Sequence, residues 1–128
     1  MKHEIISTAS AFKTDFPLSQ AVKFGNLIFC SGQIGINSET GRLAEGVEKQ
    51  AEQALQNLKA VLAAAHSGFD KVIKSTAFLV RQSDVPVLNA VYRRYFPTPF
   101  PARSCIIVQA LPRPGVEVEI EMVAYADD

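Results

Sequence analysis

Residues 46–65 form the longest regular pattern in the chain and constrain its fold more than any other segment. Charged and amide side chains occupy one side of this pattern, and the other side is apolar. The apolar positions recur at helical spacing and are Val47, Ala51, Ala54, Leu55, Leu58, Val61, Leu62 and Ala65. The pattern predicts an amphipathic helix that covers an apolar surface supplied by the rest of the chain, with its polar side solvated.

Strand patterns elsewhere supply such a surface. Residues 116–122 alternate strictly, with Val116, Val118, Ile120 and Met122 on one face and Glu117, Glu119 and Glu121 on the other. Apolar runs predict further strands at residues 5–6, 21–24, 27–30, 72–80 and 103–110. Gly25-Asn26 joins the second and third of these as a β-hairpin turn. Residues 7–17 form a polar stretch, and residues 112–115 are a predicted turn.

A second, shorter helix is expected after Asp84. Ser83 and Asp84 offer capping oxygens, and Pro86 falls in the first turn, where a missing N–H is tolerated. The helix must end by Pro97, and residues 97–101 are expected to be extended. Its apolar stripe consists of Leu88, Val91, Tyr92, Tyr95 and Phe96. We expect His66, at the end of the first helix, to adopt the left-handed conformation.

The resulting order is β-β-β-α-β-α-β-β, which predicts a two-layer α+β fold with an antiparallel or mixed sheet. A length of 128 residues suits a single domain spanning residues 1–128 and leaves no room for separate cofactor and substrate domains. The formal net charge is zero, which argues against nucleic-acid and membrane-surface partners. No apolar run approaches the roughly 20 residues of a membrane span.

The inventory of reactive side chains excludes several kinds of site. Cys30 and Cys105 are far apart in the sequence, and with two histidines they cannot build a closed zinc site. We interpret both as reduced thiols of a cytoplasmic protein, since no secretory signal precedes them. His3 and His66 lie near a terminus and at a helix end, so a catalytic triad is not expected. No phosphate-binding loop is present, and neither a metal nor an organic cofactor is predicted.

Two features carry chemistry. Arg103 lies at the start of a predicted apolar strand, just after a rigid proline segment, and is on the same face of that strand as Cys105. It either clamps a carboxylate with two parallel hydrogen bonds or is a surface arginine at a strand start. The glutamates at 117, 119 and 121 either form a solvated sheet face, orient a water molecule in a pocket, or lie at an oligomer interface.

Several short motifs together resemble the reactive intermediate deaminase (RidA, or YjgF) family, which also carries the label endoribonuclease L-PSP. The motifs are Ser19-Gln20-Ala21-Val22, Cys30-Ser31-Gly32-Gln33, Asn89-Ala90-Val91-Tyr92, Phe100-Pro101-Ala102-Arg103-Ser104 and Val118-Glu119-Ile120-Glu121, together with Gly41. Each motif alone is weak, but their order and spacing extend over residues 5–125. The resemblance implies a chorismate-mutase-like fold, a mixed sheet with two helices on one face, assembled as a homotrimer with clefts between subunits.

The resemblance also implies a site and a reaction. Arg103 matches the carboxylate-binding arginine, Glu119 the carboxylate that positions or activates water, and Cys105 a neighbour whose backbone holds the ligand. Ser31, Gly32 and Asn89 match positions in or beside the cleft. The implied activity is hydrolysis of 2-aminoacrylate (2-iminopropanoate) and 2-iminobutanoate to 2-oxo acids and ammonia, without a cofactor.

One position departs from the family pattern. Leu18 replaces the tyrosine that offers a hydroxyl to the ligand, which makes this position apolar and puts the substrate detail in question. Two alternatives to the deaminase remain open at this level. One is a carboxylate-binding or interaction protein without turnover, and the other is an endoribonuclease or translation inhibitor, which the zero net charge disfavours.

Overall fold

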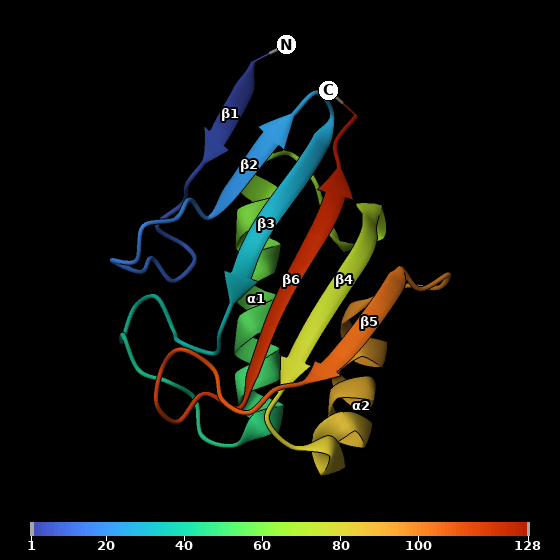
Figure 1. Cartoon of the computed structure of the whole chain (residues 1–128). Coiled ribbons are helices and arrows are strands. Elements are labelled where there is room, and N and C mark those ends of the chain that lie inside the picture. Colours follow the sequence, from blue (N-terminus) through green and yellow to red (C-terminus); the bar gives the residue numbers. More distant parts are fainter. Residues whose placement is uncertain (1, 128) are drawn as a thin grey trace.

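A computed structural model describes residues 2–127 as one six-stranded sheet with two helices packed on one face (Figure 1). The strands are β1 (His3–Ile6), β2 (Ala21–Phe24), β3 (Leu27–Gln33), β4 (Val72–Leu79), β5 (Ala102–Ile107) and β6 (Val118–Tyr125), and the helices are α1 (Val47–Ala64) and α2 (Val85–Tyr95). Short 3-10 turns, Phe69–Lys71 and Gln82–Asp84, precede β4 and α2. This two-layer α+β arrangement confirms the fold predicted from the sequence.

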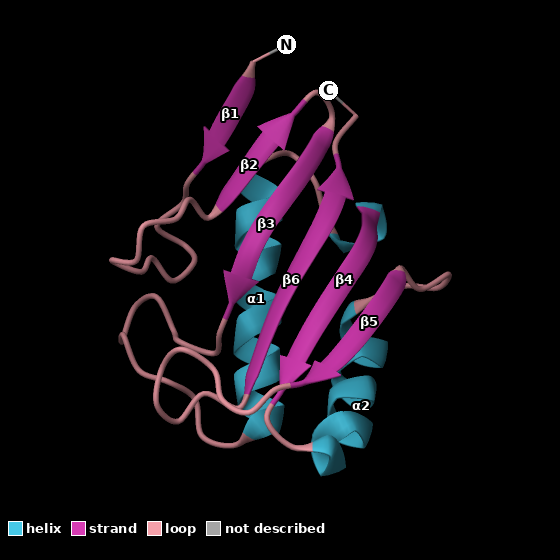
Figure 2. Ribbon diagram, in the orientation of Figure 1, coloured by secondary structure: helices cyan, strands magenta, loops and turns pink. Residues whose placement is uncertain are grey.

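The sheet is mixed, in the order β1-β2-β3-β6-β4-β5 (Figure 2). All neighbouring strands pair antiparallel except β4 and β5, which are parallel. A parallel pair needs a long crossover, and α2 provides it between β4 and β5. The crossover makes β5 an edge strand, and it places Arg103 at the border between the sheet and α2.

The core lies between the helices and one face of the sheet. The predicted apolar stripe of α1 is buried, including fully buried Leu55, Leu58 and Leu62. Val118, Ile120 and Met122 of β6 face these side chains and are likewise buried. The two periodicities read from the sequence, helical and alternating, therefore meet at the same interface.

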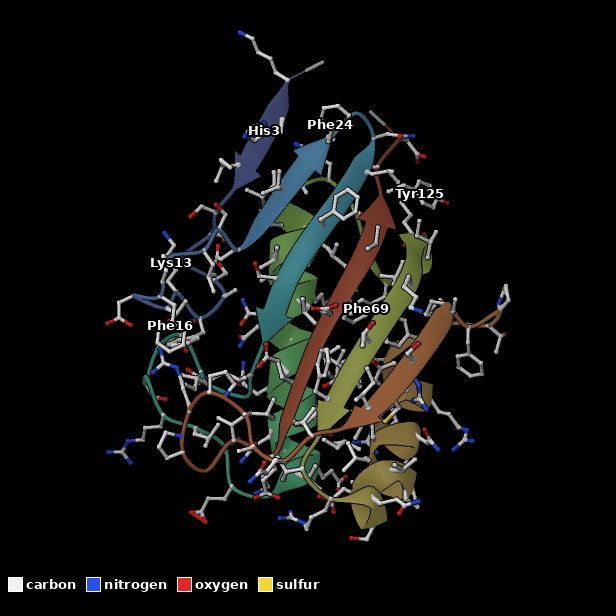
Figure 3. All side chains as sticks on the ribbon, viewed as in Figure 1. His3, Lys13, Phe16, Phe24, Phe69 and Tyr125 are labelled. Carbon is white, nitrogen blue, oxygen red and sulfur yellow. The ribbon has the colours of Figure 1, made fainter. Side chains whose placement is uncertain are left out.

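The opposite face of the sheet, here called the open face, is covered by no helix of residues 2–127. Strand registry places Phe29 beside Val22 and Val123, and Ile106 beside Phe78, all on this face. Large apolar side chains remain exposed there, namely Ile5, Phe24, Leu27, Phe29 and Ile106. Phe24 and Tyr125 lie near the same end of the sheet (Figure 3). Large exposed apolar patches on folded proteins are characteristic of interaction sites.

Local details both confirm and correct the sequence predictions. His66 has a φ of 61° and Gly25 a φ of 63°, as a helix end and a hairpin turn require. The predicted capping of α2 is wrong, because no side chain makes a cap hydrogen bond there and the Asp84 carboxylate instead pairs with Arg81 at 3.0 Å.

The predicted bounds of the last two strands also need correction. β5 ends at Ile107 rather than at residue 110, and β6 runs from Val118 to Tyr125. Glu117 therefore precedes the strand, where Arg81 holds its carboxylate and Gln50 accepts a hydrogen bond from its backbone N–H. Within residues 2–127 no helix is long and apolar enough to cross a membrane.

Candidate functional site

Glu119 lies on the open face of β6 and is only half-buried, between the buried residues Val118 and Ile120. Its carboxylate lies directly over Gly32 of β3, so a Cβ atom at position 32 would collide with it. The pairing of β3 with β6 is irregular between Cys30 and Gln33, the segment that contains Ser31 and Gly32. The glycine and the irregular strand together make room for one carboxylate side chain.

A cavity of about 360 Å³, here called the Glu119 cavity, opens beside this carboxylate. Its wall includes three of the residues singled out in the sequence, Leu18, Gly32 and Glu119. Leu18 is 50% exposed and contributes apolar surface. Ser31 does not line the cavity; its hydroxyl donates to the Ser19 carbonyl at 2.6 Å, and its N–H donates to the Gln20 carbonyl at 2.9 Å. Ser31 thus anchors the chain that leads to Leu18.

Burial raises the pKa of the Glu119 carboxyl above its usual range, and the nearby charge of Glu121 adds to the effect. A carboxylate with a raised pKa is a stronger base than an exposed one, which suits it to accept a proton from water near neutral pH. Among residues 2–127, no three His, Cys, Asp or Glu side chains are grouped so that they could hold a metal ion. The raised pKa suits the Glu119 carboxylate to act as a general base or a hydrogen-bond acceptor.

Arg103 lines a second hollow of about 300 Å³, here called the Arg103 pocket, between β5 and α2. The other lining residues are Asn89, Tyr92, Arg93, Phe100 and Pro101. The Arg103 guanidinium lies 5.0 Å from the centre of the Tyr92 ring, and a 2.6 Å hydrogen bond to Ser75 fixes the Tyr92 hydroxyl. Arg103 has no ion-pair partner in the described part of the chain, so its charge is available to an anion.

Cys105 occupies the same face of β5 as Arg103, as the alternation of a strand requires. It is partly buried, packs against the core and does not line the Arg103 pocket. Cys30 is buried in the core, which raises the pKa of its thiol to about 12. Both thiols are free.

The structure does not bring Arg103 and Glu119 together within one chain. Arg103 pairs with Ser75, which faces the helices, whereas Glu119 pairs with Phe78 on the open face. Two strand spacings and three residues along the strand separate the two positions, about 14 Å between Cα atoms. A small ligand held by Arg103 therefore cannot reach Glu119 of the same chain.

Most of the wall of the Glu119 cavity was missed in the sequence. Phe12, Phe16 and Arg113 are among the missed residues that line it, because the sequence indicated only a polar stretch and a turn at these places. The one available signal was the pair of phenylalanines, four residues apart in an otherwise polar segment.

Comparisons with known proteins show the family to which the chain belongs. The family model described as endoribonuclease L-PSP matches residues 8–126. The RutC family protein UK114 of Drosophila melanogaster is 47% identical over 94% of this chain and 88% of its own length. The human 2-iminobutanoate/2-iminopropanoate deaminase is 43% identical over 94% of this chain and 88% of its own length.

A solved structure shows the same fold. The crystal structure of RidA from an Antarctic Psychrobacter species aligns with a TM-score of 0.92 and 42% identity, covering 95% of this chain and 98% of that one. Sequence, family model and fold agree over nearly the whole chain. The protein therefore belongs to the RidA/YjgF family, whose family model carries the description endoribonuclease L-PSP.

Proposed function

We propose that this protein is a 2-iminobutanoate/2-iminopropanoate deaminase. It adds water across the C=N bond of a small 2-imino acid, and the resulting carbinolamine collapses to a 2-oxo acid and ammonia. The reaction needs no electron transfer and no cofactor, since one water molecule supplies the new oxygen and two of the hydrogens of ammonia, and the third is already on the imine nitrogen. The human relative that bears this activity in its name supports the assignment.

One observation carries the proposal: the chain holds an unpaired arginine and a half-buried carboxylate in two separate hollows. Imine hydrolysis requires both groups, one to hold the substrate carboxylate and one to direct water. We infer that the Arg103 pocket of one subunit faces the Glu119 cavity of its neighbour. The exposed apolar side chains of the open face support this inference, because a second copy of the chain would bury them. The family resemblance implies that three subunits assemble, which gives a homotrimer with three equivalent sites.

In this site Arg103 binds the carboxylate of the imine with its planar pair of donors. The Tyr92 ring packs against the guanidinium, and Asn89 borders the same ligand. A role for the Cys105 backbone in holding the ligand rests on the family resemblance alone. Glu119 accepts a proton from the attacking water, helped by its raised pKa. Gly32 leaves space for the carboxylate, and Leu18 faces the substrate side chain.

The direct test generates 2-aminoacrylate and 2-iminobutanoate enzymatically and follows ammonia and 2-oxo acid release. We expect faster release with the protein than without it, dependent on Arg103. Release at the uncatalysed rate, together with measurable binding of a small carboxylate, would instead indicate a binding protein without turnover. Sedimentation at micromolar concentration tests the assembly, and a stable folded monomer would contradict the trimer.

A second candidate function is RNA cleavage, which the description of the matching family model favours. The chain carries 13 basic and 13 acidic residues and therefore no excess positive charge to neutralise phosphates. The same preparation should be incubated with single-stranded RNA. Cleavage that persists in the Arg103 and Glu119 variants would point to a separate or contaminating nuclease. We further propose a cytoplasmic location, which the two free thiols support.

A further inference from the structure

The segment from Phe12 to Leu18, here called the strap, crosses the Glu119 cavity between β1 and β2. Five of its residues line the cavity, namely Phe12, Lys13, Thr14, Phe16 and Leu18. Lys13 and Phe16 lie on the loop that projects from the sheet on the side of β1 and β2 (Figure 3). The strap has no regular secondary structure, so its path depends on contacts with the rest of the molecule.

Arg113 makes most of those contacts. Its guanidinium lies 4.5 Å from the centre of the Phe16 ring and 5.4 Å from that of Phe12. It also donates a 2.8 Å hydrogen bond to the Thr14 hydroxyl and lies 3.7 Å from the Asp15 carboxylate. Two cation–π contacts and one hydrogen bond thus hold the middle of the strap to a residue about a hundred positions away in the sequence.

The turn that carries Arg113 is stiff. Pro112 and Pro114 flank the arginine, which fixes the backbone φ on both sides, and Gly115 adopts a φ of 82°. The turn connects β5 to β6, and Glu119 follows Arg113 by six residues. A stiff turn presents the guanidinium in one place, so Arg113 can act as a fixed point for the strap.

The beginning of the strap and the residues after it are held independently of Arg113. The side-chain amide of Gln20 donates to the Phe12 carbonyl at 3.1 Å and its oxygen accepts from the Thr8 N–H at 2.7 Å. Ser31 holds the Ser19 carbonyl, as described above. Loss of Arg113 would therefore release residues 13–17 while leaving both ends attached.

The cavity under the strap is mostly apolar. Besides the aromatic rings, its wall includes Ile5, Ile6, Leu18, Leu111 and Val116, and Lys13 is exposed. Its volume of about 360 Å³ falls at the lower end of the range for small-molecule pockets, roughly 300–1,000 Å³. Such a cavity fits an aliphatic side chain better than a charged one.

We propose that Arg113 is a positioning residue that sets substrate specificity: by holding the strap, it shapes the cavity beside Glu119 into a subsite for large apolar side chains of 2-imino acids. The inference rests on the proposed function. Aminoacrylate is too small to use the subsite, so the benefit of an ordered strap falls on leucine- or methionine-derived imines. Arg113 itself touches the strap and not the reacting atoms.

The test compares Arg113→Met, Arg113→Lys and the control Arg42→Met with the unchanged protein. Methionine keeps an unbranched apolar chain but removes the charge, and Arg42 is exposed and has no ion pair within residues 2–127. The first readout is hydrogen exchange of the Phe16 and Leu18 amides, which donate to the Thr14 hydroxyl and the Phe16 carbonyl inside the strap. The second readout is the ratio of kcat/KM for the leucine-derived imine to that for aminoacrylate.

For Arg113→Met we expect exchange at both amides to accelerate and the kcat/KM ratio to fall, each by about tenfold, as loss of the cation–π contacts and the hydrogen bond predicts. Arg113→Lys should recover part of both effects, because lysine keeps the charge without the flat guanidinium. Arg42→Met should change neither.

Two results would overturn the proposal. Unchanged exchange in Arg113→Met would show that Arg113 does not hold the strap. Faster exchange with an unchanged ratio would show that the strap does not shape the substrate subsite. If no imine is hydrolysed by any variant, the proposed function fails, whereas the exchange measurement still decides whether Arg113 holds the strap.

Discussion

The Arg103 pocket and the Glu119 cavity differ in position and in the charge that they offer. The first is bordered by an edge strand and a helix, and it offers a positive charge that has no ion-pair partner among residues 2–127. The second is mostly apolar, lies under a loop beside the middle of the sheet, and holds a half-buried carboxylate with a raised pKa. Figure 1 shows β5, the strand that carries Arg103, at one edge of the sheet and the β1–β2 loop toward the other edge.

Each region lacks what the other has. An arginine without a base binds a carboxylate but cannot activate water. In the Glu119 cavity the guanidinium of Arg113 is engaged with the strap, through the rings of Phe12 and Phe16 and the Thr14 hydroxyl, so it is not placed to hold a small anion beside Glu119. We propose that the single chain contains two half-sites, the Arg103 pocket and the Glu119 cavity, which become one site when two copies meet. Substitutions that alter one half-site at a time test whether both half-sites contribute to the same reaction.

The largest effect is expected from Arg103→Ala. Loss of a charged, bidentate contact in a partly desolvated cleft should cost about 2–5 kcal/mol in kcat/KM, so imine hydrolysis should fall to near the uncatalysed rate while the assembly stays folded. Arg103→Lys should recover little, because lysine lacks the planar pair of donors. Steady-state kinetics measure turnover of both variants, and sedimentation checks that they remain assembled. Near-normal turnover in Arg103→Ala would mean that Arg103 does not bind the substrate carboxylate.

Glu119→Gln should act on the other half-site in a different way. We expect turnover to fall about a hundredfold, at the lower end of general-base catalysis, because the imine already hydrolyses slowly in water. Binding of a small carboxylate inhibitor should change much less, since Arg103 remains. Calorimetry together with kinetics separates the two quantities. Weakened binding with preserved kcat would mean that Glu119 has a structural role.

Leu18→Tyr should have a moderate effect. A new neutral hydrogen bond is worth about 0.5–1.5 kcal/mol, at most about tenfold in rate or affinity. Replacing the leucine also removes apolar surface from the side-chain subsite, so preference should shift toward aminoacrylate and away from longer imines. The kcat/KM ratio for short and long imines measures this shift, and a constant ratio would mean that position 18 does not face the substrate.

The smallest effect concerns pH. Because burial and Glu121 raise the pKa of Glu119, the base form is lost as pH falls through a value above the ordinary glutamate pKa of about 4.3. The acid limb of kcat/KM should lie above that value, and Glu121→Gln should move it to lower pH by removing the like charge. An acid limb unchanged in Glu121→Gln would contradict the electrostatic contribution of Glu121.

The sheet, the helices and the positions of Arg103 and Glu119 on their strands were predictable from local sequence, whereas the roles of these two residues came only from the family resemblance. Strict alternation from Val116 to Met122 predicted a strand with Glu119 on its outer face, and the rigid segment before Arg103 predicted an arginine at a strand start. Both predictions depend on side-chain spacing within a few residues, and the backbone geometry of a strand fixes that spacing.

The wall of the Glu119 cavity could not be predicted in this way. The strap takes its path from contacts between Arg113 and Phe12, Thr14 and Phe16, which lie about a hundred residues away. Nothing in the spacing of residues 7–17 encodes that contact. The predicted capping of α2 was wrong for a related reason. The Asp84 carboxylate forms an ion pair with Arg81 and makes no hydrogen bond to the N–H groups of the helix.

The most direct test of the two half-sites is complementation between two inactive variants. Arg103→Ala and Glu119→Gln are each prepared, unfolded, mixed in equal amounts and refolded together. Sites that join an intact Arg103 from one chain to an intact Glu119 from its neighbour should restore about a quarter of the wild-type sites in randomly mixed cyclic assemblies. Recovered imine hydrolysis near that level supports a site shared between chains, and a mixture as inactive as its two components, despite confirmed mixed assembly, would contradict it.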